Sequence, residues 1–252
     1  MKDKRLVFDS ITDQFDKWRA RYSEELFDYI VKTCKMNEEK KVLEIGPGTG
    51  QATDFALLTG CDYTAIELGA NNTAFMREKY GTFPNFRIIN DDFETHEFPE
   101  NEFDIVYSAA TIQWIRQTLA YEKCYSILKS GGFLAMFRMG SDYKNKNPKL
   151  YEEIQQEYAE HYAVEIPYTC KFDYEIGEQF GFRYLGKTKF YGQRIYTADE
   201  YVEFIKTNAD LITIKEECKE PFFGGVKDAV LRHGNQIVID DTFVLDLYQK
   251  NV

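Results

Sequence analysis

The chain has 252 residues, of which 44% are hydrophobic and 29% charged, which is enough for one large domain with a substantial core. It contains no run of about 18 apolar residues, and the N-terminal MKDKRLVFDS lacks the apolar stretch of a signal peptide, so we expect a cytoplasmic protein without a membrane partner. The formal net charge of −11 disfavours nucleic acid as a partner.

The cysteines and histidines show no spacing typical of a metal site. The five cysteines are scattered and never form Cys-x-x-Cys, and the three histidines lie far apart. These residues are Cys34, Cys61, Cys124, Cys170, Cys218, His96, His161 and His233. We therefore predict reduced thiols and no bound metal.

The first forty residues carry helical patterns. Apolar side chains recur at helical spacing at Phe8, Ile11, Phe15 and Trp18. Ser23 is a typical N-cap for a second helix. Its inward residues are Leu26, Phe27, Ile30 and Val31. We expect a helical cap over residues 1–40.

Strands and helices alternate from residue 41 to residue 140. Short β-rich runs predict strands at 41–45, 63–67, 86–89, 103–107 and 133–137. Helices are predicted at 51–59, 70–80 and 114–129, with stop signals at Gly60 and Gly81 and a turn at Gly131 and Gly132. Serial strand-helix units indicate a parallel sheet with helices on both faces.

The alternation ends after Gly140. The polar, tyrosine-rich stretch 141–181 predicts a largely helical insertion over the sheet edge, which is a candidate lid. A strand at 182–192, a helix opened by the capping box from Thr197 to Glu200, a helix at about 221–233 and a strand at 236–248 follow. We expect a single domain over 1–252, built from a cap (1–40), a core (41–140), the insertion (141–181) and a C-terminal part (182–252).

A glycine-rich turn follows the first predicted strand. Gly46, Gly48 and Gly50 let the backbone turn tightly and approach a ligand closely. Unpaired amides at the following helix N-terminus would favour an anionic group. The dinucleotide pattern Gly-x-Gly-x-x-Gly requires glycine or alanine at position 51, where this chain has Gln51. The turn therefore indicates a nucleotide-type ligand but argues against a dinucleotide.

Acidic residues follow the next two strands. Glu67 closes the second strand, where a carboxylate accepts both hydroxyls of a ribose. Asp92 follows the third strand, where it could accept the adenine amino group while Phe93 covers the base. Each residue alone also fits a solvated turn. In register with the glycine turn, they favour a ligand that contains adenosine.

Four segments between residues 40 and 138 resemble the successive motifs of class I S-adenosylmethionine-dependent methyltransferases. They are VLEIGPGTGQAT, YTAIE, NDDFETHEFPENEFDIVYSAATIQWI and ILKSGGFLAMF. The C-terminal RHGNQIVIDDTFVLDLYQK resembles the last strand of small-molecule enzymes similar to the trans-aconitate and ubiquinone-biosynthesis methyltransferases. The resemblance implies an α/β, Rossmann-like, seven-stranded, mostly parallel sheet with an antiparallel last strand, sandwiched by helices, and S-adenosyl-L-methionine as cofactor.

The resemblance also implies the roles of individual residues. The methionine moiety would be held by Glu44 and by the turn from Gly46 to Gly50, with Gln51 also at the cofactor. Glu67 would bind the ribose, Leu68 one face of the adenine, and Asp92 with Phe93 the adenine edge. Ser108 and Ala109 would line the sulfonium end. Gln113 stands where many relatives have a histidine, so no histidine is available there for proton transfer.

The acceptor side is less clearly marked. Methyl transfer from a sulfonium mainly needs alignment and exclusion of water, so no obligatory catalytic residue follows. The leading candidates are Trp18, Arg19, Arg21 and Tyr22 in the cap and Trp114 after the fourth strand. In the functional interpretation, Arg21 and Tyr22 close over the cofactor carboxylate and the tryptophans shape the acceptor pocket. In the alternative, Trp18 is a core anchor and the arginines are solvated.

A group of residues in the insertion could line an aromatic pocket or could simply cover apolar surface. Its members are Tyr158, His161, Tyr162, Tyr168 and Tyr174. His161 is a weak candidate for a general base, and the catalytic residues are otherwise unknown.

The sequence thus predicts methyl transfer to a small molecule by a monomer or homodimer, with the acceptor atom left open. Two alternatives remain. A nucleotide-linked oxidoreductase shares the strand-turn-helix pattern but is disfavoured by Gln51. A non-catalytic, cofactor-binding relative is compatible with the lack of an identifiable catalytic acid or base.

Overall fold

The computed structural model describes residues 3–251 and divides into two compact units. The sheet unit comprises residues 21–139, 170–190 and 243–251, and the helical unit comprises residues 3–20, 140–169 and 191–242. The predicted single domain over 1–252 stays a prediction. Among the described residues, no helix is both long and apolar enough to cross a membrane.

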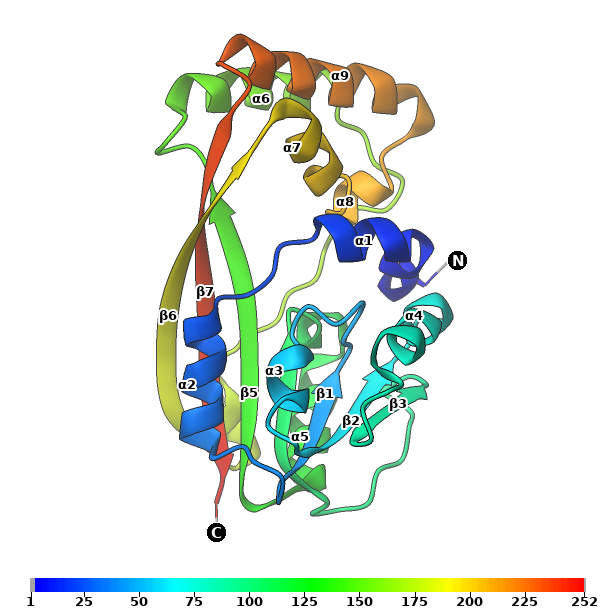
Figure 1. Cartoon of the computed structure of the whole chain (residues 1–252), viewed down its shortest axis with the longest axis vertical. Helices are drawn as coiled ribbons and strands as arrows, with labels where there is room; N and C mark the ends of the chain where they lie inside the picture. The colour runs from blue at the N-terminus through cyan, green and yellow to red at the C-terminus, as the bar shows by residue number, and fades with distance from the viewer. Residues whose placement is uncertain (1–2, 252) are drawn as a thin grey trace. The chain divides into compact units, whose positions relative to one another are not determined.

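Seven strands form one mixed sheet, as predicted (Figure 1). Its order is β3-β2-β1-β4-β5-β7-β6. The strands are β1 (Lys41–Ile45), β2 (Asp62–Glu67), β3 (Phe86–Asn90), β4 (Phe103–Ala109), β5 (Leu128–Asp142), β6 (Phe182–Tyr196) and β7 (Ile237–Lys250). The pairs from β3 to β5 are parallel, whereas β7 runs antiparallel to β5 and β6 (Figure 1). Parallel pairing brings the carboxyl ends of β1, β2 and β4 to one edge, where the predicted cofactor residues lie.

Alternation along the strands builds a core on each face of the sheet unit. Val42 packs with residues of α2 (Glu24–Cys34), α3 (Asp54–Leu57) and α4 (Ala70–Tyr80). Its neighbour Leu43 points to the opposite face and packs with α5 (Gln117–Ile127). We call these the α2 face and the α5 face. Two short 3₁₀ helices, η3 (Ile112–Trp114) and η4 (Gly177–Phe180), complete the unit.

The helical unit contains the remaining helices of the described residues. They are η1 (Lys4–Leu6), η2 (Phe8–Ile11), α1 (Thr12–Trp18), α6 (Pro148–His161), α7 (Ala198–Ile205), α8 (Ala209–Ile212) and α9 (Glu216–Arg232). Helix α9 packs against α6 and α7, and α1 packs against α7. The predicted capping box is present, because Thr197 accepts from the Glu200 amide while Glu200 accepts from the Thr197 amide. The predicted N-cap of α2 in the sheet unit is also confirmed, with Ser23 accepting from the Leu26 amide.

Two predicted helices are shorter than expected. The helix predicted over 51–59 is reduced to α3, because the Ala52 carbonyl accepts from the Tyr107 hydroxyl at 2.9 Å. The Ala56 amide, which would bond that carbonyl in a longer helix, bonds Thr53 instead. The helix predicted over 114–129 begins only at Gln117, after η3, and ends at Ile127.

The other corrections concern glycines and the insertion. Gly131 and Gly132 lie inside β5 rather than in a turn, at an irregularity where β4 and β5 change register. Gly131 has a φ of 75°, and a Cβ on Gly132 would meet the Asp104 carbonyl oxygen at 3.0 Å, so both positions suit glycine. The stretch 141–181 is not largely helical, since residues 162–176 between α6 and η4 form no helix.

Candidate functional site

The glycine turn is held by the protein itself. The amides of Gly46, Gly48 and Gly50 donate to the Ile66 carbonyl at 2.9 Å, the Glu67 carboxylate at 3.1 Å and the Pro47 carbonyl at 2.9 Å. Among the backbone amides of this strand-turn-helix segment, some of which we expect to be unpaired, the three glycine amides are therefore already paired within the chain. All three glycines have positive φ angles of 59–88°, which explains the residue type.

Close packing is a second reason why two of these positions require glycine. A Cβ on Gly46 would overlap the Thr111 side chain, and a Cβ on Gly50 would lie 2.7 Å from the Tyr80 ring. The turn carbonyls also point into the protein. The carbonyl of Gly50 accepts from Tyr80 and from Arg21, each at 3.3 Å. The turn is thus a preformed, rigid element at the carboxyl edge of the sheet.

Glu67 ties the turn to the start of α4. One carboxylate oxygen accepts from the Gly48 amide, and the other accepts from the Gly69 amide at 2.8 Å. The side chain is 8% exposed. The predicted contact of Glu67 with a ribose stays a prediction. The neighbouring Leu68 is half-buried.

Glu44 is fully buried in β1, two residues before the glycine turn, and its partners Tyr63 and Tyr107 belong to the core of the α2 face. Its Oε2 accepts from three hydroxyls, those of Tyr63, Thr53 at 2.7 Å and Tyr107 at 2.8 Å. Its Oε1 has no hydrogen-bond partner among the described residues. Burial raises the pKa of Glu44, and the hydrogen bonds to Tyr63, Thr53 and Tyr107 oppose that rise. No local sequence pattern predicts this hydroxyl cluster, because its members lie in three separate segments of the chain.

Asp92 and Phe93 lie in the segment after β3. Asp92 is half-buried and its Oδ1 accepts from the Glu94 amide at 2.9 Å, which shapes the turn. Phe93 is only 5% exposed and packs in the core of the α5 face, with its ring centroid 6.2 Å from that of Phe98. The Phe93 ring therefore packs in the protein core, and its predicted place over the adenine stays a prediction.

The end of β4 lies beside the glycine turn. Ser108 is fully buried and donates to the Ile45 carbonyl at 3.2 Å, and Ala109 next to it is half-buried. Thr111 donates to the Gly46 carbonyl at 2.8 Å, so the segment after β4 is fixed to the turn. Trp114, in η3, is half-buried.

Arg21, Tyr22 and Gln51 also lie in the sheet unit. Besides its bond to Gly50, Arg21 is largely exposed. Tyr22 packs edge-on against Phe137 with a centroid distance of 5.0 Å, so its ring belongs to an aromatic cluster. Gln51 donates to the Thr49 hydroxyl at 2.6 Å.

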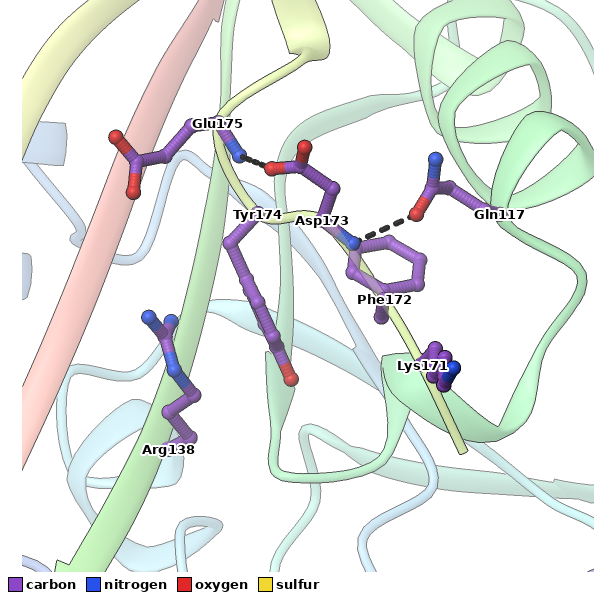
Figure 2. A pocket seen from close by; sticks show the side chains of 7 residues that line it. All are labelled: Gln117, Arg138, Lys171, Phe172, Asp173, Tyr174 and Glu175. Atoms are coloured by element: carbon purple, nitrogen blue, oxygen red, sulfur yellow. Dashed lines mark hydrogen bonds between the residues drawn. The ribbon is translucent and has the colours of Figure 1, made fainter. Parts of the chain in front are cut away.

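A pocket of about 410 Å³ opens on the α5 face (Figure 2). Its lining residues are Gln117, Arg138, Lys171, Phe172, Asp173, Tyr174 and Glu175. The Arg138 guanidinium stacks on the Tyr174 ring at 3.9 Å and forms a 2.6 Å ion pair with the buried Asp246. The Tyr174 hydroxyl donates to Gln113 at 2.9 Å, which links the pocket to η3. Sequence inspection missed Arg138, since an arginine in a strand carries no signal of a pocket.

The remaining predicted acceptor residues lie in the helical unit. Trp18 is half-buried with the Lys17 ammonium 4.9 Å from its ring, and Arg19 donates to Asn208 at 2.9 Å. His161 lies 3.8 Å from both Glu157 and Glu160 of its own helix. Their predicted roles at an acceptor, including that of His161 as a base, stay predictions.

The predicted aromatic pocket does not form as one cluster within a unit. Tyr158 packs on Phe222 with a centroid distance of 4.8 Å, and Tyr162 lies 5.3 Å from Tyr158. Tyr168 is 43% exposed. Tyr174 belongs to the sheet unit.

Comparison with known proteins supports the sequence motifs. Residues 43–136 match the family model described as "Methyltransferase domain". A malonyl-[acyl-carrier protein] O-methyltransferase from Paenibacillus sp. is 35% identical over 133 residues, which are 49% of this chain and 45% of that protein. A ribosomal RNA small subunit methyltransferase A from Hahella chejuensis is 30% identical over 79 residues, which are 31% of this chain and 29% of that protein.

Residues 43–136 carry a methyltransferase domain of the class I S-adenosylmethionine-dependent type. This chain spans less than half the length of either curated relative. A solved structure of Haemonchus contortus phosphoethanolamine N-methyltransferase 2, with phosphomonomethylethanolamine and S-adenosylhomocysteine, matches with a TM-score of 0.58 at 18% identity. The match covers 100% of this chain and 61% of that one, and at this identity it shows the fold alone. Membership of the trans-aconitate and ubiquinone-biosynthesis subgroup stays a prediction.

Proposed function

We propose that this protein binds S-adenosyl-L-methionine at the carboxyl edge of β1, β2 and β4 and transfers its methyl group to a small-molecule acceptor. The observation that carries the proposal is the preformed turn from Gly46 to Gly50, which is hydrogen-bonded to Glu67 and follows the buried Glu44 in the chain. The matching methyltransferase domain, over residues 43–136, contains all of these residues.

The residues present fit this cofactor. Glu67 is fixed by two backbone amides, and a carboxylate is the group that accepts hydrogen bonds from ribose hydroxyls. Glu44 holds a buried carboxylate oxygen without a partner among the described residues, which suits the ammonium group of the methionine moiety. Leu68, Asp92 and the backbone of Phe93 follow β2 and β3, where the adenine would lie. Ser108 and Ala109 would face the sulfonium end.

The cofactor supplies an electrophilic methyl group on its sulfonium. The protein's own contribution is then to hold the acceptor in line and to exclude water. The segment from Ala109 to Trp114 is suited to this task, because Thr111 fixes it to the glycine turn and Gln113 fixes it to Tyr174. A proton acceptor is required only if the acceptor atom arrives protonated.

We assign the acceptor side to the pocket that Arg138 and Tyr174 line. The pocket belongs to the same unit as the glycine turn, and its 410 Å³ suits a small molecule. Arg138 follows Phe137 in β5, and Phe137 is the register partner of Ala109 at the end of β4. The net charge of −11 further favours a small acceptor over RNA.

Calorimetric titration with S-adenosylhomocysteine tests the cofactor assignment. We expect wild type to bind it and Glu67→Ala to bind it about 10-fold or more weakly, because a hydrogen bond to a charged group is lost. Glu122→Ala, which removes an exposed carboxylate of α5, is the matched control and should bind like wild type. Absence of binding by wild type at millimolar concentration, or tighter binding of NAD, would overturn the assignment.

Turnover tests the activity separately. Conversion of S-adenosylmethionine to S-adenosylhomocysteine that depends on an added small acceptor supports methyl transfer. Tight binding of the cofactor without turnover, across acceptors with oxygen, nitrogen, carbon and sulfur nucleophiles, would favour the non-catalytic alternative.

A further inference from the structure

The three hydroxyls around Glu44 come from the elements that flank it. Tyr63 lies on β2 and Tyr107 on β4, the two strands that pair with β1, and Tyr107 is the register partner of Glu44. Thr53 immediately precedes α3. Each of these side chains is fully buried. Three separate elements thus bring a hydroxyl to the same carboxylate atom.

These hydroxyls bind to only one of the two carboxylate oxygens of Glu44. All three donate to Oε2, while Oε1 has no partner among residues 3–251. Burial raises the pKa of Tyr63 and of Tyr107 well above the ordinary value, so both keep their protons and act as donors. A carboxylate held this way cannot rotate to share the donors without breaking the cluster.

We propose that Tyr63, Tyr107 and Thr53 are positioning residues that occupy Oε2 of Glu44 and so reserve Oε1 as the acceptor for the cofactor's ammonium group, directly or through one water molecule. The inference rests on the proposed function and extends it to residues outside the glycine motif. It assigns recognition of the amino acid end of the ligand to a buried charge rather than to the glycine amides, which are already paired.

The energetics favour a cationic partner for Oε1. A buried charged oxygen without a hydrogen bond is costly, and a buried carboxylate normally has a paired cation. Asp54, the nearby charged group that acts on Glu44, is itself acidic and raises the pKa of Glu44 further. An ammonium group is the part of the cofactor that satisfies both the missing hydrogen bond and the missing positive charge.

Two probes separate the amino acid end of the cofactor from its adenosine end. S-adenosylhomocysteine carries the amino acid moiety, whereas 5′-methylthioadenosine has the same adenosine and thioether sulfur without it. We expect Tyr63→Phe and Tyr107→Phe each to weaken binding of S-adenosylhomocysteine about 3- to 10-fold, as the loss of one hydrogen bond implies. Binding of 5′-methylthioadenosine should change less than about 2-fold, since the groups that contact adenosine are untouched.

Thr53 and Glu44 provide the next comparisons. Thr53→Val should behave like Tyr63→Phe, while Thr53→Ser keeps the hydroxyl and should restore wild-type affinity. Glu44→Gln should weaken S-adenosylhomocysteine about 10- to 100-fold and leave 5′-methylthioadenosine nearly unchanged, because only the charged contact is removed.

Tyr121→Phe is the matched control. Tyr121 is a fully buried tyrosine of the α5 face whose hydroxyl donates to the Asp173 carbonyl, so its loss is chemically equivalent but remote from Glu44. It should change the affinity for neither probe. Binding of 5′-methylthioadenosine by each variant also reports that the site is folded.

The outcomes separate this inference from the proposed function. If wild type binds both probes and the hydroxyl variants weaken both equally, or neither, the positioning role is wrong and the cofactor assignment stands. If wild type binds neither probe, the cofactor assignment itself fails.

Discussion

Two buried carboxylates lie on opposite faces of the same sheet and are satisfied very differently. Asp246, in β7 on the α5 face, is fully buried, and both of its oxygens are occupied, by Arg138 at 2.6 Å and by the Tyr184 hydroxyl at 2.8 Å. Glu44, in β1 on the α2 face, is equally buried but has one oxygen without a partner in the described chain and no cation beside it.

This difference distinguishes a carboxylate that stabilises the fold from one that is suited to bind a ligand. A buried ion that is fully paired within the chain needs nothing from solution, whereas one that is half-paired is destabilising until something completes it. A folded protein retains such a group where a ligand supplies the missing partner. We therefore assign Asp246 to the framework and Glu44 to the cofactor site.

The largest expected effect is the loss of stability when the Arg138–Asp246 ion pair is broken. Arg138→Met would leave the Asp246 charge buried with only the Tyr184 hydroxyl, and we expect a loss of about 2–4 kcal/mol in the free energy of unfolding. Urea denaturation followed by circular dichroism measures this. An unchanged denaturation midpoint would mean that Asp246 does not depend on Arg138.

The same measurement on Glu44 should give the opposite result. Glu44→Gln removes the charge whose partner is missing, so without ligand we expect the stability at neutral pH to change by about 1 kcal/mol or less. The affinity for S-adenosylhomocysteine should fall in the same variant. A stability loss as large as that of Arg138→Met would show that Glu44 is a framework residue, and would contradict the comparison.

The pH dependence of binding sharpens the assignment. Burial raises the pKa of Glu44, so in the ligand-free protein its carboxyl stays protonated to higher pH than in the unfolded chain. Its contribution to stability is therefore present at low pH and declines as the pH rises through the raised pKa. An ammonium ligand prefers the ionised form, so the affinity for S-adenosylhomocysteine should increase with pH over that window.

Tyr63→Phe should shift this profile. The Tyr63 hydroxyl lowers the pKa of Glu44, as Thr53 and Tyr107 also do, while Asp54 raises it. Loss of the Tyr63 donor should move the rise in affinity to higher pH, as measured by calorimetry at several pH values. The profile for 5′-methylthioadenosine, which lacks the ammonium group, should stay flat in both proteins. A profile that shifts equally for both ligands would point to another titrating group.

The smallest effect is expected at His161 on α6. The His161 side chain is 39% exposed and lies 3.8 Å from Glu160, whose side chain is 71% exposed, so water screens this pair. His161→Gln should change the free energy of unfolding by less than about 0.5 kcal/mol. A large drop in turnover at unchanged stability would instead support His161 as a general base, once an acceptor is known.

Much of the sheet could be predicted because local patterns agree with the fold there. The bounds of β1, and of α4 up to its stop at Gly81, match the predictions residue for residue. The errors fall where tertiary contacts override local preference. The Tyr107 hydroxyl takes the Ala52 carbonyl and shortens α3, and a bulge places Gly131 and Gly132 inside β5.

The site shows the same division. The sequence by itself determined that a glycine turn, Glu67 and Asp92 follow consecutive strands, because strand-helix alternation places the ends of parallel strands at one edge. Only the tertiary structure decided that the glycine amides are already paired, that the Phe93 ring is buried, and that Tyr63, Thr53 and Tyr107 converge on Glu44. Such convergence depends on side chains from separate elements meeting across a folded sheet, and no local pattern in the chain encodes that meeting.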